Sequence, residues 1–259
     1  MIRIRTTDSS SASGSIALGA RGKWGGLILL GNAPTSAATP KQIEGITGKT
    51  YGGTSPTDSS GTLQYVRVWH GGAIIGADNE INGITFAGVG DGTTVDHCEV
   101  AYNLDDGFEW FGGTVNAKYL SVLFGKDDSF DTDEGYQGKA QFLFTMLGNA
   151  GNHGTEMDSK TNSNYDSMPR SHPAFYSMTI IGGGSSGRGG GLMRLREGTG
   201  GKFGNVILAN PTDIGLRIGD CGSEAVSQTL PQTLLEQKTR VPFPERNAFC
   251  GNRAHASCG

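Results

Sequence analysis

The sequence predicts an all-β fold, namely a right-handed, single-stranded parallel β-helix with coils of about 22–25 residues. Short strand-like runs of apolar residues recur along the chain and are separated by turns rich in glycine, asparagine and aspartate. Helical periodicity is almost absent, and residues 232–238 are the one fair candidate for a helix. Glycine supplies 43 of the 259 residues without the three-residue period of collagen, which suits the tight corners of a solenoid.

An internal repeat carries the fold prediction. Residues 105–110 (DDGFEW) align with residues 127–132 (DDSFDT) at an offset of 22. Further strand segments fall into the same repeat at 117–125, 140–148, 155–157, 193–195 and 216–218. The longest interval contains an insertion rich in Asn, Ser and Asp, at 159–172. Leucine-rich repeats share the period, but their leucine pattern is missing, and a propeller blade needs roughly twice the length.

The chain divides into a repeating part and an irregular part. We expect residues 1–218 to form the solenoid and residues 219–259, which hold three of the four cysteines, to form a cap or tail. We also expect the chain to be a piece of a longer solenoid, because residues 1–5 read as the end of a strand. Cys98 lies in an apolar strand and is predicted to be a buried thiol. A disulfide of Cys250 with Cys258 or Cys221 remains open.

Charge and hydropathy exclude two classes of partner. The net charge is −4, whereas binding to nucleic acid phosphates needs a basic surface. No apolar run approaches the ~20 residues that span a bilayer. We therefore expect neither a nucleic acid partner nor a membrane span.

Three ordered motifs resemble a known family. They are WGGLILLG at 24–31, NEINGIT at 79–85 and DDGFEWFGG at 105–113. They look like the hallmarks of large secreted bacterial proteins with a right-handed parallel β-helix of the pectin-lyase-like type, and the resemblance runs from about 22 to 218. It implies the fold and an extracellular or cell-surface location. The family has no settled activity, and the wider fold includes lyases, glycosidases and esterases as well as adhesins and tailspikes.

The repeat also predicts a column of carboxylates. Alternate residues of a strand face opposite sides, so Phe108 and Trp110 point inward and Glu109 points outward. One coil later Asp131 points outward, and Glu156 follows in the next coil. Asp133 and Asp158 form a second column beside the first, and Thr85, Arg194, Arg196 and Arg217 continue the same face. Neighbours within a column lie about 5 Å apart at the backbone.

Stacked like charges need compensation, and three kinds are open. A bound cation such as Ca²⁺ would use Asp128, Asp131, Asp133 and Asp158. Neighbouring arginines would neutralise the carboxylates, or one carboxyl would hold a proton with a raised pKa. The same residues could equally be a solvated surface without further function.

The column could also carry catalysis by Glu109, Asp131 and Glu156. Carboxyls on adjacent coils fall near the ~5–5.5 Å of a retaining glycosidase pair, and carboxyls two coils apart near the ~6.5–9.5 Å of an inverting pair. A lyase would instead combine a cation with a basic side chain. His153 is the one histidine near the column, whereas His97 beside Asp96 is expected to be structural.

Side chains that would bind a sugar complete the candidate site. The carboxylate of a uronate would be held by Arg194, Arg196 and Arg217. The rings of Trp69, Phe111 and Tyr136 would stack against sugars.

We therefore expect a secreted or cell-surface module that binds a polysaccharide or cell-surface glycan, or serves as an adhesive or structural element, without catalysis. The alternative is a polysaccharide lyase or glycoside hydrolase that works on the acidic column. Self-association through the solenoid ends is a weaker expectation. A groove around the column would favour the enzyme, and a flat face would favour the binding module.

Overall fold

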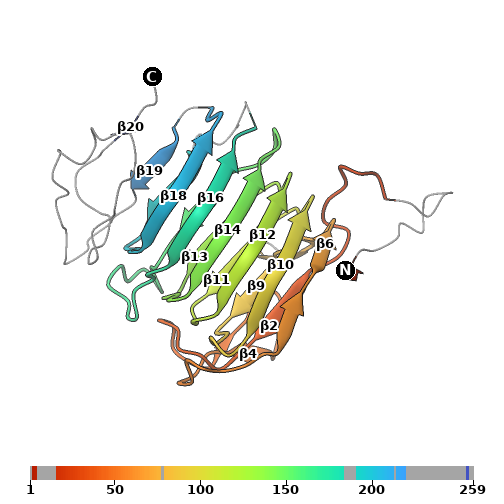
Figure 1. Cartoon of the computed structure of the whole chain (residues 1–259). Coiled ribbons are helices and arrows are strands. Elements are labelled where there is room, and N and C mark those ends of the chain that lie inside the picture. The colour runs from red at the N-terminus through yellow and green to blue at the C-terminus, as the bar shows by residue number, and fades with distance from the viewer. Residues whose placement is uncertain are drawn as a thin grey trace.

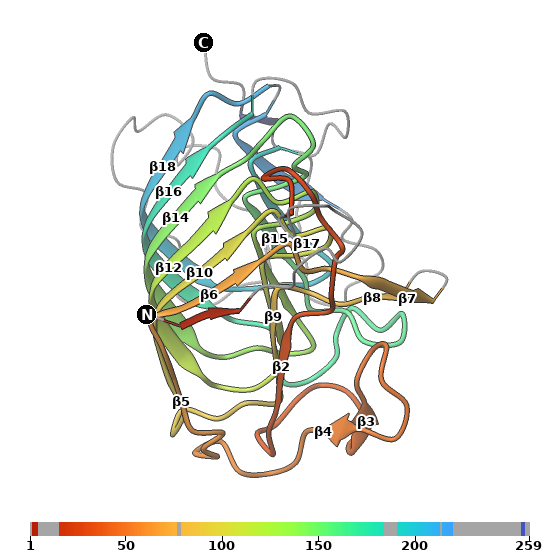
Figure 2. The ribbon, with the colours of Figure 1, turned by 90° about the vertical axis from the view of Figure 1, so that its right-hand side faces the viewer.

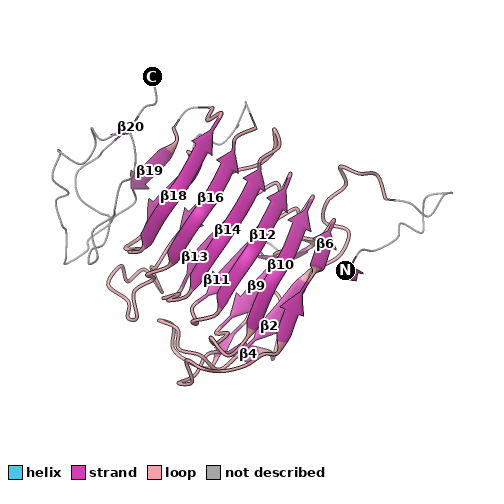
Figure 3. Ribbon diagram, in the orientation of Figure 1, coloured by secondary structure: helices cyan, strands magenta, loops and turns pink. Residues whose placement is uncertain are grey.

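The computed structural model has the predicted architecture, a right-handed parallel β-helix (Figure 1). It describes residues 16–76, 79–183, 191–212 and 214–219, together with the backbone of residues 2–4 and 255–256. Figure 3 shows strands and loops and no helix in these parts of the chain. Within them, no helix is long and apolar enough to cross a membrane.

Two large sheets run along the solenoid and face each other across its core (Figure 2). Sheet A consists of β1 (Ile2–Ile4), β5 (Thr62–Gln64), β6 (Val66–Trp69), β10 (Thr94–Ala101), β12 (Asn116–Leu123), β14 (Lys139–Met146), β16 (Ala174–Ile181) and β18 (Lys202–Ala209). Sheet B consists of β2 (Leu27–Leu30), β9 (Ile84–Ala87), β11 (Phe108–Phe111), β13 (Phe130–Asp133), β15 (Thr155–Met157), β17 (Met193–Arg196), β19 (Leu216–Gly219) and β20 (His255–Ala256). Two hairpins stand outside the sheets, β3 (Lys41–Gln42) with β4 (Thr50–Tyr51) and β7 (Ile74–Gly76) with β8 (Asn79–Glu80).

The core between the sheets is filled by rows of large side chains, one from each coil. Phe108 pairs with Phe130 in the strand register, and their rings stack at 5.8 Å between centroids. Trp110 stacks on Phe86 at 5.6 Å and on Tyr136 at 5.4 Å, and all five side chains are fully buried. One coil alone could not bury these rings, so the coils stabilise one another. Cys98 belongs to the same core as a buried thiol, as predicted.

Each eight-residue strand of sheet A bends at one residue in the left-handed conformation, and Tyr65, between β5 and β6, adopts the same conformation. Tyr65 and three of the strand residues carry aromatic rings, which stack on the solvent side of the sheet. The aromatic column consists of Tyr65, His97, Tyr119 and Phe142, with centroid distances of 4.8, 4.4 and 4.7 Å. Their φ angles lie between 50° and 63°, which costs energy for any side chain with a Cβ atom. Stacking offsets that cost in part.

The first coil carries an insertion, residues 31–61, that packs on the outer face of sheet B. Ile43 and Tyr51 of this insertion are buried against Ala87 and Phe111. The backbone N–H of Ser36 donates to the carbonyl of Glu134 at 2.8 Å, beyond the end of β13. The insertion therefore spans several coils and forms a second, smaller apolar core.

The boundary predicted at residue 218 falls at the end of the described solenoid, in β19. Beyond it only β20 is described, and it pairs with β19 in the antiparallel direction. The candidate helix at 232–238 and the cysteines at 221, 250 and 258 lie outside the described residues. Their predicted roles stay predictions.

The aromatic column generates a stability prediction. Tyr119→Ala should lower the free energy of unfolding by about 1–3 kcal/mol, because it removes two ring contacts and keeps a Cβ atom at positive φ. Tyr119→Gly should cost less than Tyr119→Ala, since glycine adopts positive φ without steric strain. Urea unfolding of the three proteins measures this. Equal losses in both variants would show that the left-handed conformation carries no strain.

Candidate functional site

The outer face of sheet B carries the predicted column in the predicted register. Glu109 pairs with Asp131, and Asp131 pairs with Glu156. Thr85 precedes Glu109, and Arg194 follows Glu156. The face therefore changes along the solenoid axis from apolar and neutral coils to three acidic coils and then to basic ones.

The column is more buried than an outward-facing row was expected to be. Asp131 and Glu156 are each 8% exposed and Asp158 is 6% exposed, whereas Glu109 and Asp133 are half-buried. Insertions on the outer face explain the difference. Residues 31–61 pack beside β11 and β13, and the segment 159–172 meets them where the hydroxyls of Ser36 and Thr161 lie 2.6 Å apart.

Two arginines neutralise the last acidic coil. Arg194 Nη1 donates to Glu156 Oε1 at 2.9 Å, and Arg196 Nη2 donates to Glu156 Oε2 at 2.7 Å. Arg196 also donates from Nε to both carboxylate oxygens of Asp158, at 2.7 and 2.8 Å. Arginine compensation, one of the three alternatives, therefore holds for Glu156 and Asp158.

The earlier acidic coils are compensated differently. Glu109 accepts a hydrogen bond from the Asn82 amide, and Asp131 Oδ1 is buried with no hydrogen-bond partner among the described residues. Burial is the main cause that raises the pKa of both carboxyls well above the usual range. The charge of Asp105 adds to the effect on Glu109, and that of Asp106 adds to the effect on Asp131.

The arginine-paired carboxyls are also shifted. Burial and the charge of Asp128 raise the pKa of Glu156 to about 8, and Arg196 and Arg194 act in the opposite direction. Burial raises the pKa of Asp158 to about 6, against the lowering effect of its hydrogen bonds from Arg196. The site thus contains carboxyls that titrate near neutral pH, as functional sites often do.

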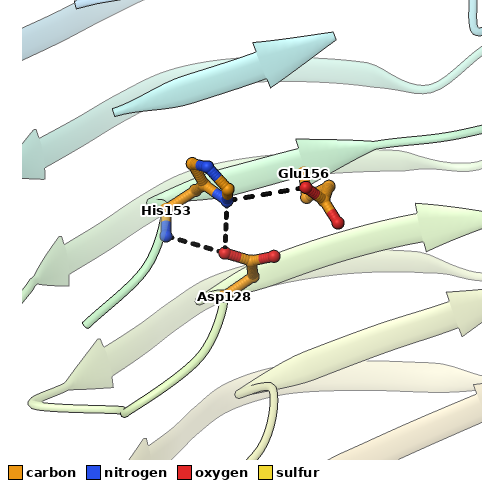
Figure 4. Close-up of side chains that lie close together, drawn as sticks. All are labelled: Asp128, His153 and Glu156. Carbon is orange, nitrogen blue, oxygen red and sulfur yellow. Dashed lines mark hydrogen bonds and ion pairs between the residues drawn. The ribbon is translucent and has the colours of Figure 1, made fainter. Parts of the chain in front are cut away.

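A second polar ladder lies at the corner where the chain enters sheet B. Asp106 Oδ1 accepts the backbone N–H of Asp128 at 2.9 Å. One coil later Asp128 Oδ1 accepts a hydrogen bond from the backbone N–H of His153 and is hydrogen-bonded to the Nδ1 atom of the same residue, each at 2.7 Å (Figure 4). His153 Nδ1 also lies 3.6 Å from Glu156 Oε1, so this corner joins the carboxylate column.

The structure brings together two groups of possible metal ligands among the described residues. One consists of Asp128, His153 and Glu156, and the other of Asp106, Asp128 and Asp131. The predicted calcium set was Asp128, Asp131, Asp133 and Asp158. Only Asp128 and Asp131 of that set share a group, because Asp158 is engaged by Arg196 and Asp133 lies at the far end of β13.

The predicted sugar-stacking rings do not fit their positions. Tyr136 is fully buried and its hydroxyl donates to the carbonyl of Val115 at 2.8 Å, so this assignment was wrong. Phe111 faces outward but is 8% exposed under the insertion 31–61, which leaves its ring no room for a sugar. Trp69 lies in sheet A, away from the column, where its Nε1 donates to Glu99 at 2.9 Å.

Sequence reasoning missed Asn82 and Asp106 as parts of the site. The repeat of Asp105-Asp106 at 127–128 was visible, but turn formation explained it sufficiently. The alignment that placed Glu109 over Asp131 also places Asp106 over Asp128, and extending it to His153 would have identified the corner ladder.

The chain is similar to a known family of β-helix domains. A family model described as a pectate-lyase-like beta helix domain matches residues 12–243. No curated protein and no solved structure gives a significant match.

The buried carboxyls predict how stability depends on pH. Their pKa values are raised on folding, so the folded state holds protons that the unfolded chain has lost. With divalent cations removed, the free energy of unfolding should therefore fall as the pH rises from about 5 to 8. Asp131→Asn should flatten this slope and raise stability at pH 8 by about 1–3 kcal/mol, because it removes an unpartnered buried carboxylate.

Denaturant unfolding at several pH values measures this dependence. The exposed Asp91→Asn provides the matched control and should change little. Stability that is constant or rises between pH 5 and 8 would contradict the assignment of raised pKa values.

Proposed function

Because the chain belongs to the pectate-lyase-like beta helix family, we propose that it is a secreted or cell-surface module that binds an acidic polysaccharide along the outer face of sheet B. Domains of this class are often extracellular. The fold alone does not select a ligand, so the proposal depends on the site.

One observation carries the proposal. The outer face of sheet B presents carboxylates and guanidinium groups in consecutive register, from Glu109 through Asp131 and Glu156 to Arg194 and Arg217. Carboxylates accept and guanidinium groups donate several hydrogen bonds in fixed planes, which suits the closely spaced hydroxyls and carboxylates of a uronate chain.

The partly exposed members of the face are the groups that would touch the ligand. Arg194 and Arg196 have side chains that are 19% and 24% exposed, so each keeps surface beyond its ion pair. Glu109 and Asp133 are half-buried at the acidic end. We assign the acidic groups of the polysaccharide to the arginine end and its hydroxyls to the acidic end.

Calcium is part of the proposal. Asp106, Asp128 and Asp131 form an all-oxygen group, the ligand type that Ca²⁺ prefers. A cation there would compensate buried carboxylates that have no arginine partner.

Polysaccharide cleavage is the second candidate, and the register of two carboxyls favours it. Asp131 and Glu156 pair on adjacent strands, whose spacing of about 4.8 Å is close to the ~5–5.5 Å between the carboxyls of a retaining glycosidase. Glu156, which Arg194 and Arg196 bind, would be the carboxylate, and Asp131, whose pKa burial raises well above the usual range, would be the general acid.

Binding to polygalacturonate, with a neutral β-glucan as the comparison polymer, tests the proposal. Arg194→Gln should weaken binding of polygalacturonate about tenfold, which corresponds to the loss of one charge-assisted hydrogen bond. Arg67→Gln is the matched control, because Arg67 pairs with Glu99 at 3.1 Å on the other sheet, and it should leave binding unchanged. Isothermal titration calorimetry measures both variants.

Two results would count against a binding module on this face. One is the absence of binding to either polymer, and the other is equal loss in both arginine variants. If the protein releases reducing ends or unsaturated products, and if Asp131→Asn and Glu156→Gln both abolish this release, the face is instead the active site of a polysaccharide-cleaving enzyme.

A further inference from the structure

We propose that Asp128, His153 and Glu156 form a binding site for a divalent transition-metal ion of the zinc class, at the corner where the chain enters β15 (Figure 4). The site shares Asp128 with the proposed calcium group and Glu156 with the carboxylate column. It differs in chemistry from a calcium site, because one of its ligands is an imidazole nitrogen.

The three side chains converge from two neighbouring coils. Asp128 precedes β13, His153 precedes β15, and Glu156 is the middle residue of β15. Their exposed fractions are 3%, 1% and 8%, so water has little access to them. His153 Nδ1 lies 2.7 Å from Asp128 Oδ1 and 3.6 Å from Glu156 Oε1, and one ligand atom of each residue lies within 4.8 Å of the others.

An unpartnered carboxylate oxygen beside the group indicates a missing ligand. Asp131 is 8% exposed, and its Oδ1 makes no hydrogen bond to the described residues. A carboxylate oxygen of Asp131 lies within 4.8 Å of an oxygen of Asp128. A buried carboxylate oxygen without any partner is costly, and a cation held by Asp128 would interact with it directly.

The surrounding charges leave room for a divalent cation. The carboxyls of Asp106, Asp128, Asp131, Glu156 and Asp158 gather here, and among the described residues Arg194 and Arg196 form ion pairs with Glu156 and Asp158. Both arginines approach Glu156 from the β17 side, and each Glu156 oxygen has a second lone pair available for a metal. The carboxyls therefore outnumber the positive charges when they are ionised.

The ligand types select the class of metal. One imidazole nitrogen with carboxylate oxygens suits Zn²⁺ or Mn²⁺, whereas Ca²⁺ and Mg²⁺ prefer oxygen ligands alone. The separation of 3.6 Å between Nδ1 and Oε1 is close to the edge of a tetrahedron around Zn²⁺ with bonds of about 2.0–2.2 Å. The shorter contact to Asp128 must lengthen, or the second oxygen of Asp128 must become the ligand.

Metal binding exchanges the contact between His153 Nδ1 and Asp128 Oδ1 for three metal–ligand bonds, one from each side chain. A ligating Nδ1 donates its lone pair, so the ring proton of His153 is on Nε2 in the metal-bound state. Nε2 has no hydrogen-bond partner among the described residues, so no hydrogen bond is broken there. The ion then connects His153 and Asp128 in place of the proton.

Metal titration of the chelator-treated protein tests the site. Isothermal titration calorimetry with ZnCl₂ and with CaCl₂ should show one zinc site with higher affinity than calcium. His153→Asn should weaken zinc binding at least about tenfold and leave any calcium binding unchanged. His97→Asn is the matched control, because His97 forms a similar pair with Asp96, 2.8 Å apart, but is exposed on sheet A.

A spectroscopic measurement keeps the proposal testable if His153→Asn fails to fold. Cu²⁺ bound to the His97→Asn protein should show nitrogen hyperfine coupling from one imidazole in electron paramagnetic resonance. Oxygen-only coordination, zinc binding that is equal in both histidine variants, or calcium binding without zinc binding would each overturn the proposal. Calcium binding without zinc binding would leave Asp106, Asp128 and Asp131 as the cation site, and the proposal of polysaccharide binding would still stand.

Discussion

The in-register stacking of coils is the constraint on which the rest of the structure depends. Parallel strands about 4.8 Å apart place equivalent residues of successive coils in contact. The same rule builds the ring stack through Phe108 and Phe130 inside and the aromatic column through His97 and Tyr119 outside. It also forces Glu109, Asp131 and Glu156 together, although like charges repel.

The acidic column is therefore compensated by different means along its length. Arg194 and Arg196 neutralise the coil of Glu156, whereas Glu109 and Asp131 have raised pKa values because of burial and neighbouring carboxylates. A purely structural row would have been more stable with neutral side chains at these positions. We take these retained carboxyls as support for the proposed ligand site.

The sequence predicted the fold and the register well, because a solenoid repeats its local pattern and each offset can be checked against the next. It placed Asp131 between Glu109 and Glu156 correctly. It could not predict burial, because insertions such as 31–61 have no place in the repeat and their packing is a long-range event. For this reason the ring of Phe111 was assigned to a ligand, although it supports the insertion.

The insertion also changes how the solenoid responds to force. A stack of coils that contact only their neighbours can be peeled away one coil at a time. Here the segment that leaves β2 is tied to Glu134 by Tyr51 and Ser36, several coils further along the axis. Tension applied to the N-terminal coils is therefore shared with the coils that carry the acidic column. The first half of the solenoid should yield as one mechanical unit rather than unravel stepwise.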